Sequence, residues 1–130
     1  MSDAWTQQCQ QYLTKYPALK CLAITSLDGT IYGNSDATEF PLDQAFMKQV
    51  FASMKGDPAS SIPLAGEKYM CLRSSPDCWL GRKEKKAIFV YPCRTIAVVG
   101  LSQDTESANN TSNGSDSVAR LAELYMKSNY

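Results

Sequence analysis

The chain has 130 residues, of which 44% are hydrophobic and 20% charged, a size and composition typical of one globular domain. Its 13 basic residues balance 13 acidic ones, and the sequence pI is about 6.2. The chain therefore lacks the basic excess with which nucleic-acid-binding proteins neutralise phosphates, and we expect no nucleic-acid partner.

The residue types also argue against catalysis and against a membrane protein. The sequence contains no histidine, which is the commonest general base and metal ligand. No Gly-rich phosphate loop, metal-ligand cluster or nucleophile beside a base is evident, so we expect neither an enzyme nor a cofactor. No apolar run approaches the ~20 residues of a transmembrane segment, and no secretory signal pattern opens the chain. Five cysteines without a CxxC pair favour reduced thiols and a cytoplasmic location.

The first third of the chain predicts a helix followed by a hairpin. Apolar residues within 5–13 recur at the spacing of one helix face, and Pro17 ends this helix. The apolar run 21–25 predicts a strand. Residues 28–29, Asp-Gly, are a turn signal, and Ile31 begins the return strand.

A second helix is predicted in the middle of the chain. Pro41 suits its first turn, and Gly56 followed by Pro58 suits its end. Residues 57–65, which contain Pro58 and Pro63, are predicted to be a loop. The apolar side chains of this helix share one face: Phe46, Met47, Val50, Phe51 and Met54.

The last part of the chain predicts a meander and a final helix. Spacings between its strand-like runs are too short for crossover helices, so the strands should pair antiparallel. The whole order predicts a single α/β domain over residues 1–130, with helices packed on a central antiparallel sheet. The predicted segments are strands 68–73, 78–83, 87–91 and 94–101, a polar mobile loop 102–116, and a helix over 116–128 with an inner stripe of Val118, Leu121, Ala122 and Tyr125.

Several motifs in this order resemble profilins, and the resemblance spans nearly the whole chain. It implies a central antiparallel sheet with the N- and C-terminal helices packed together on one face and a further helix on the other. It also implies a monomeric, cytoskeleton-associated protein that binds monomeric actin, regulates polymerisation and links actin to proline-rich partners. The matching residues are Trp5, the strand 20–24, Asp28-Gly29-Thr30-Ile31-Tyr32, Gly66-Glu67-Lys68-Tyr69 with Arg73, Gly81-Arg82-Lys83, the strand 95–100 and Tyr130.

The resemblance implies an aromatic platform for proline-rich segments. A polyproline II segment is already extended, so docking costs it little conformational entropy. Aromatic rings accept its pyrrolidines while Trp N–H and Tyr O–H groups bind its carbonyls. Gln8 stands where the family has a tyrosine and Tyr32 where it generally has tryptophan, and Tyr12 lies on the same helical face as Trp5. The implied platform residues are Trp5, Tyr32, Leu124, Tyr125 and Tyr130.

The resemblance also implies an actin-binding surface on the later strands and the last helix. Basic residues there suit a partner with an acidic surface. On a regular strand, Lys68 and Arg73 would point to opposite faces unless a bulge intervenes. The implied actin-binding residues are Lys68, Arg73, Arg82, Lys83 and Arg120, the last of which stands where relatives carry an acidic contact.

One short basic run predicts a further ligand. Clustered Lys and Arg side chains attract anionic phosphoinositide headgroups. The alternative is a solvated hairpin whose charges keep the protein in solution. The residues concerned are Arg82, Lys83, Lys85 and Lys86.

Two other interpretations stay open at this point. Aromatic residues on amphipathic helices commonly pack a core rather than form a ligand platform. The same order of elements also suits a longin, roadblock or PAS-type adaptor module in trafficking or sensing, because a fold alone does not assign a function. Convergence of Trp5 and Tyr130 in space discriminates between these scaffolds.

Overall fold

The computed structural model describes residues 4–56, 60–104 and 111–130, and for 111 and 112 the backbone only. Each helix and strand predicted above is present, with one additional strand. In chain order the elements are α1 (Ala4–Lys15), β1 (Cys21–Ser26), β2 (Ile31–Asn34), α2 (Gln44–Met54), β3 (Ser61–Leu64), β4 (Glu67–Ser74), β5 (Trp79–Lys83), β6 (Lys86–Pro92), β7 (Ile96–Gln103) and α3 (Thr111–Lys127).

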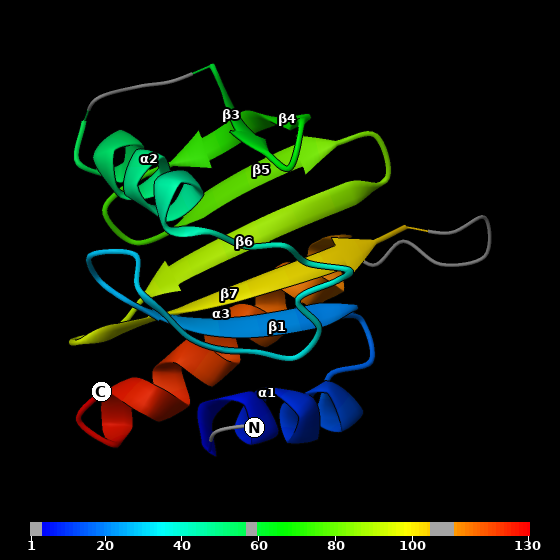
Figure 1. Ribbon diagram of the computed structural model, residues 1–130. Coiled ribbons are helices and arrows are strands. Elements are labelled where there is room, and N and C mark those ends of the chain that lie inside the picture. The colour runs from blue at the N-terminus through cyan, green and yellow to red at the C-terminus, as the bar shows by residue number, and fades with distance from the viewer. Residues whose placement is uncertain (1–3, 57–59, 105–110) are drawn as a thin grey trace.

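The strands form one curled sheet in the order β2-β1-β7-β6-β5-β4-β3, and every neighbouring pair is antiparallel (Figure 1). The predicted meander from β4 to β7 is therefore confirmed. Because β7 pairs with β1 along six residue pairs, the last strand closes onto the first hairpin. This closure brings the two ends of the chain to the same side of the molecule.

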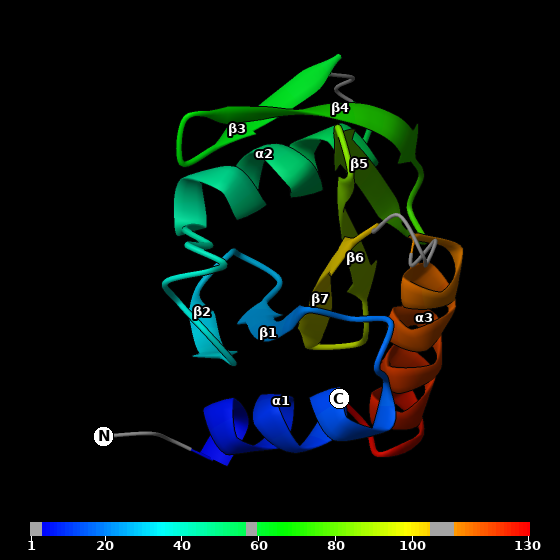
Figure 2. The ribbon, with the colours of Figure 1, turned by 90° about the vertical axis from the view of Figure 1, so that its right-hand side faces the viewer.

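Helices cover both faces of the sheet, as the resemblance implied (Figure 2). On one face α2 packs on a core cluster that contains Trp79, Phe46 and Val90. On the other face α1 lies over β1 and β2 while α3 lies over β6 and β7. Their buried side chains form a second cluster, which contains Cys9 and Leu121.

The edge strand β3 was predicted to be a loop, and that prediction is wrong for Ser61–Leu64. Ile62 and Leu64 are buried, whereas Pro63 between them is exposed. This alternation is that of a strand, and proline is tolerated at a sheet edge because no neighbour there needs its missing N–H. The predicted loop residue Pro58 lies outside the described residues.

Two helices begin at positions other than those predicted. α2 begins after Asp43 rather than at Pro41, because the Asp43 carboxylate accepts a 2.8 Å hydrogen bond from the Phe46 N–H and caps the helix. α3 begins at Thr111 rather than 116. Gly114 lies in its first turns so close to the sheet that a Cβ there would be 3.0 Å from Phe89 and Ser102. Of the predicted loop 102–116, residues 105–110 lie outside the described part of the chain.

Candidate platform and strand-face sites

Four aromatic side chains converge where the two ends of the chain meet. Trp5, at the start of α1, is the centre of the group. Its ring centroid lies 6.1 Å from that of Tyr32, 5.9 Å from Tyr125 and 5.4 Å from Tyr130. The rings of Tyr125 and Tyr130 are in turn 5.7 Å apart and perpendicular. The structure thus brings together Trp5 and Tyr130 from opposite ends of the sequence.

A glycine on β2 allows α1 to approach the sheet at this point. A Cβ built on Gly33 would lie 2.6 Å from the carbonyl carbon of Trp5 and 2.6 Å from the Thr6 nitrogen. Next to it, the Asn34 N–H donates to the Thr6 hydroxyl over 3.3 Å. Gly33 and Asn34 therefore fix the position of the first turn of α1, and with it the Trp5 ring.

The other side of the group is held by the turn between β6 and β7. The Thr95 N–H and hydroxyl both donate to the Tyr130 carbonyl oxygen, the hydroxyl over 2.9 Å. The Tyr130 N–H donates to the Tyr125 carbonyl over 2.9 Å, and Arg94 donates to the Asn129 side chain over 3.1 Å. These bonds hold the Tyr130 ring against Trp5.

The predicted platform residues differ in exposure. Tyr32, Tyr130 and Leu124 expose 38%, 41% and 47% of their surface. Tyr125 is only 6% exposed, so it forms the floor beneath the others rather than a contact surface of its own. Burial raises the pKa of the Tyr125 phenol above its ordinary value, and the phenol donates a 2.7 Å hydrogen bond to Gln8.

Two tyrosines, Tyr12 on α1 and Tyr16 just after its end, extend the aromatic group. The Tyr12 ring lies 6.2 Å from Tyr125, and the Tyr16 ring lies 6.4 Å from Tyr12. The sequence places Tyr12 on the helical face of Trp5, whereas Tyr16 is not among the predicted platform residues. Their spacing from Trp5, seven and eleven residues, is the signal that could have placed both on one flank of the helix.

A bulge in β4 decides which basic residues share a face. Met70 pairs with Arg82 and Arg73 pairs with Leu80, so Leu72 is left without a partner on β5. Directly opposite residues point to the same face of a sheet. Arg73 therefore joins Met70 and Arg82 on one face, although regular alternation would have sent it to the other.

This strand face has an apolar centre among its cations. Lys68 lies two residues from Met70 and shares its face, and Met70 is 62% exposed. Leu80 is half-buried against the cluster under α1 and α3. Tyr91 on β6 continues the face toward α3, where its hydroxyl lies 3.1 Å from the Ser115 hydroxyl. We call this surface the β4–β5 face: Lys68, Met70, Arg73, Leu80, Arg82 and Tyr91.

The remaining two predicted actin-binding residues lie elsewhere. Lys83 is adjacent to Arg82 on β5, so it points to the opposite face, where it lies 3.6 Å from Glu67. Arg120 is on the exposed side of α3 and forms an ion pair with Asp116 over 3.1 Å. The β4–β5 face thus unites Lys68, Arg73 and Arg82 but does not include Lys83.

The four residues predicted to bind phosphoinositides are divided between the two faces. Arg82 pairs with Asp104 over 2.7 Å. Lys83 and Lys86 both pair with Glu67, and the hydrogen bond and charge of Lys86, with the charge of Lys83, lower the pKa of that carboxyl. Lys85 is exposed at the hairpin tip. Three of the four cations therefore already face a carboxylate.

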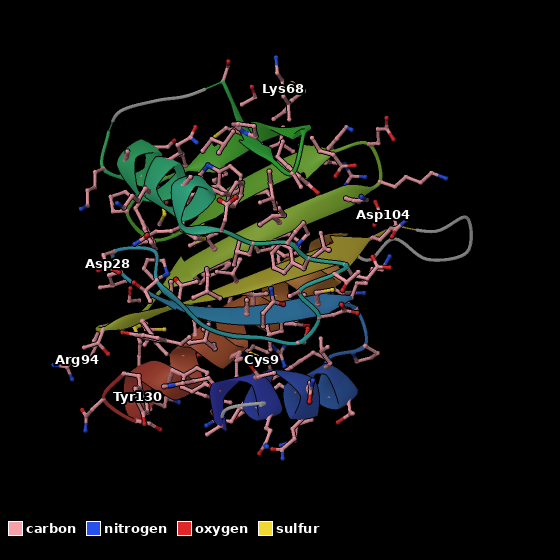
Figure 3. The ribbon with its side chains drawn as sticks, viewed as in Figure 1. Cys9, Asp28, Lys68, Arg94, Asp104 and Tyr130 are labelled. Atoms are coloured by element: carbon pink, nitrogen blue, oxygen red, sulfur yellow. The ribbon has the colours of Figure 1, made fainter. Side chains whose placement is uncertain are left out.

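The aromatic group lies at the opposite end of the molecule from Lys68, on the β4 side of the β4–β5 face. Figure 3 shows Lys68 at the outer edge of the sheet and Tyr130 at the far end, beside α1. Four strands, β1, β7, β6 and β5, separate β2 from β4 in the sheet.

An open cleft of about 590 Å³ lies at the C-terminal end of α2. Its walls are mainly apolar, with Leu27, Phe51, Met54, Pro76 and Pro92 among them. Within the described ranges 4–56, 60–104 and 111–130, no group of three or more His, Cys, Asp or Glu side chains could hold a metal ion. Among the same residues no helix is long and apolar enough to cross a membrane.

Comparison with known proteins identifies the family. The family model described as Profilin matches residues 3–130. The chain belongs to the profilin family. A profilin from Branchiostoma belcheri is 26% identical to it over 99 residues, which cover 75% of this chain and 79% of that protein. The longin, roadblock and PAS alternatives are thereby set aside.

Solved structures share the fold. Acanthamoeba castellanii profilin IB superimposes with a TM-score of 0.84 at 20% identity, covering 98% of this chain and all of that one. LokiProfilin2, solved in a complex with rabbit actin, gives a TM-score of 0.66 at 14% identity and covers 90% of this chain and 91% of its own. The observed sheet and three helices are thus the profilin fold.

Proposed function

We propose that this profilin is a non-catalytic adaptor that binds monomeric actin through the β4–β5 face and proline-rich segments through the aromatic group at its ends. The observation that carries the actin half is the bulge at Leu72, which places Arg73 beside Arg82 and the exposed Met70 on one face of the sheet. The solved complex of LokiProfilin2 with rabbit actin supports this half, because it shares the fold.

The β4–β5 face has the composition of a protein-binding surface. An exposed methionine and partly exposed Leu80 and Tyr91 supply apolar area at its centre, and Lys68 and Arg73 lie around them. Interfaces of this kind gain affinity from desolvated apolar and aromatic anchors, while the surrounding charges steer encounter and fix orientation. A partner with an acidic rim and an apolar centre fits it.

Titration with monomeric actin tests this half directly. We expect one-to-one binding and a longer lag before spontaneous polymerisation, because bound monomers are removed from nucleation. Association should slow with added salt, since exposed charges are screened within ~10 Å at about 0.1 M. Failure to bind any actin tested would overturn the proposal.

The aromatic group supports the proline-rich half. Tyr32, Trp5 and Tyr130 form a nearly continuous surface with rings 5.4 and 6.1 Å from the central tryptophan. Such rings accept pyrrolidines, and the Tyr hydroxyls and the indole N–H can donate to the carbonyls of a polyproline II segment. Since this group is remote from the β4–β5 face, one molecule could hold both ligands at once.

The β5–β6 hairpin is a candidate site for an anionic phosphoinositide headgroup. It is supported by the exposed Lys85 and by the closeness of Lys83 and Lys86. Glu67 argues against it, because its carboxylate already pairs with both Lys83 and Lys86. An anionic headgroup would have to displace this carboxylate.

A further inference from the structure

The row of aromatic rings continues beyond the platform. From Tyr32 the centroids follow one another at 6.1 Å to Trp5, 5.9 Å to Tyr125, 6.2 Å to Tyr12 and 6.4 Å to Tyr16. The last two steps run along α1 away from the chain ends. Neither Tyr12 nor Tyr16 is needed to form the platform itself; both pack against the cluster under α1 and α3, and both rings stay partly exposed.

The flank of α1 that carries these tyrosines faces α3. Thr6 and Gln10 mark the opposite flank, because they bond to Asn34 and Ser35 of the β2 region. Trp5 and Tyr12 contact Tyr125 of α3 instead. The partly exposed ring of Tyr12 therefore lines the seam between the two terminal helices, and the partly exposed Tyr16 ring lies 6.4 Å from it.

Leu124 adds an exposed apolar side chain on α3. Ser115 of α3 faces β6, since its hydroxyl lies 3.1 Å from that of Tyr91. At about 100° per residue, Leu124 lies half a turn around the helix from Ser115, on the side away from β6. Leu124 is 47% exposed. The seam itself has Tyr12 along the α1 side and Tyr125 of α3 as its floor.

We propose that a proline-rich segment binds along this whole row, from Tyr32 to Tyr16, and that an acidic residue of the segment is preferred at the Tyr16 end. The inference rests on the proposed proline-rich half of the function and extends it. A polyproline II helix rises ~3.1 Å per residue, so a spacing near 6 Å between neighbouring rings matches about two residues, and a segment that reaches Tyr16 must be longer than one that covers only the platform. The platform alone accommodates only the first part of such a segment.

Lys15 supports the preference for an acidic residue. Its ammonium lies 5.6 Å from the centre of the Tyr12 ring, at the end of the row. Among the described residues, none of the observed ion pairs includes Lys15. A carboxylate carried by the segment would pair with this ammonium while the neighbouring prolines contact the rings.

Two peptides and one conservative variant test the length of the site. The probes are six-proline and twelve-proline peptides, titrated against the full chain and against Tyr12→Leu, which keeps an apolar side chain on Tyr125 but removes the ring. We expect Tyr12→Leu to weaken binding of the long peptide by about tenfold, equivalent to ~1.4 kcal/mol, and to leave the short peptide unchanged. A longer peptide can bind in more registers than a short one. This advantage is the same for both proteins, so it cancels when their affinities for one peptide are compared.

Tyr16→Leu should act in the same direction as Tyr12→Leu, and unchanged binding of monomeric actin would show that both variants are folded. Equal weakening of the two peptides, or no weakening of either, would overturn the inference while leaving the platform intact. If neither peptide changes the fluorescence of Trp5, the proline-rich half of the proposed function fails together with the inference.

A second pair of peptides tests the acidic preference. Twelve-residue proline peptides carrying one glutamate at the first or at the last position place the carboxylate at either end of the row. We expect one of the two to bind about two- to fivefold more tightly than the neutral peptide, with the gain lost in Lys15→Gln and at high salt. A gain that survives Lys15→Gln, or no gain at either position, would refute this part.

Discussion

The phenol of Tyr125 donates a 2.7 Å hydrogen bond to Oε1 of Gln8, across 117 positions of sequence. The bond joins α3 to α1 beneath the aromatic platform. In the profilin resemblance Gln8 replaces an aromatic residue, which reduces the apolar surface. The structure gives the replacement a role, because the side-chain amide supplies the acceptor that the nearly buried phenol requires.

Replacing Gln8 should therefore destabilise the packing of the two helices. Gln8→Ala leaves the Tyr125 hydroxyl buried without its acceptor, and we expect the free energy of unfolding to fall by about 1–3 kcal/mol. Thermal or denaturant unfolding measures the loss. Gln11→Ala, on the exposed side of the same helix, is the matched control and should change stability by less than about 0.5 kcal/mol. Equal effects of the two variants would show that the bond contributes nothing.

Gly33→Ala should displace the platform without touching an aromatic residue. The added methyl would meet the backbone of Trp5 and Thr6 at 2.6 Å, so the first turn of α1 must move away from β2. We expect a loss of about 1–3 kcal/mol in stability and a loss of the fluorescence response of Trp5 to proline-rich peptide. Binding of monomeric actin should persist, because the β4–β5 face lies at the other end of the sheet. A variant with an unaltered peptide response would show that α1 adjusts freely.

Arg73→Glu tests the strand face that the bulge creates. Reversing a charge beside the apolar centre at Met70 should weaken actin binding by at least about tenfold and slow association most at low salt. Lys48→Glu makes the same change on α2, which covers the opposite face of the sheet, and should leave the affinity nearly unchanged. Isothermal titration with monomeric actin compares the two variants. Similar losses in both would place the binding surface elsewhere.

That strand face was only partly predictable from the sequence. The alternation of β4 separates Lys68 and Arg73 by an odd number of residues, which predicts opposite faces. The bulge at Leu72 instead places Arg73 on the same face as Lys68. The sequence around Leu72 carries no glycine or other bulge signal. Hydrogen bonding to β5 determines the register, and such long-range pairing is not encoded in any local pattern.

Elements with strong periodicity and clear end signals were predicted correctly, and those without them were not. α1 and the strands β1 and β6 carry apolar residues at regular spacing. β3 was missed because Pro63 indicates a loop, and only pairing with β4 makes it a strand. The first turn of α3 was missed because its polar sequence lacks an apolar stripe, so its helix depends on packing of Gly114 against the sheet.

Glu67→Gln should expose the basic hairpin to anionic lipid. The substitution removes the carboxylate that pairs with Lys83 and Lys86, leaving both cations available beside Lys85. We expect association with vesicles that contain phosphoinositide to increase about threefold or more at low salt and to fall steeply as salt is added. Replacing Lys83, Lys85 and Lys86 together by Gln should abolish the increase. Unchanged association in Glu67→Gln would show that the hairpin is a solvated turn.

The same carboxylate predicts a pH dependence of stability. Its pKa is lowered in the folded state, so the stabilisation is present above the pKa of the unfolded chain and is lost as pH falls through the folded value. Acid titration of the unfolding free energy should therefore be less steep in Glu67→Gln than in the unaltered protein below about pH 4.5. Identical acid profiles would mean that the ion pairs of Glu67 with Lys83 and Lys86 are too well solvated to contribute to stability.

The two tryptophans provide an internal comparison for the proline-rich half of the proposed function. Trp5 is partly exposed at the centre of the platform, whereas Trp79 is fully buried on the face covered by α2, with its ring 5.8 Å from Phe46. Proline-rich peptide should therefore change the emission of Trp5 and leave that of Trp79 constant. Trp5→Ala should abolish the signal and detectable peptide binding but retain the affinity for actin. Trp79→Phe should retain the signal, although it will lower stability by leaving a cavity in the core. A peptide response that persists in Trp5→Ala would show that proline-rich segments bind outside the aromatic group, and the function proposed here would then be reduced to its actin half.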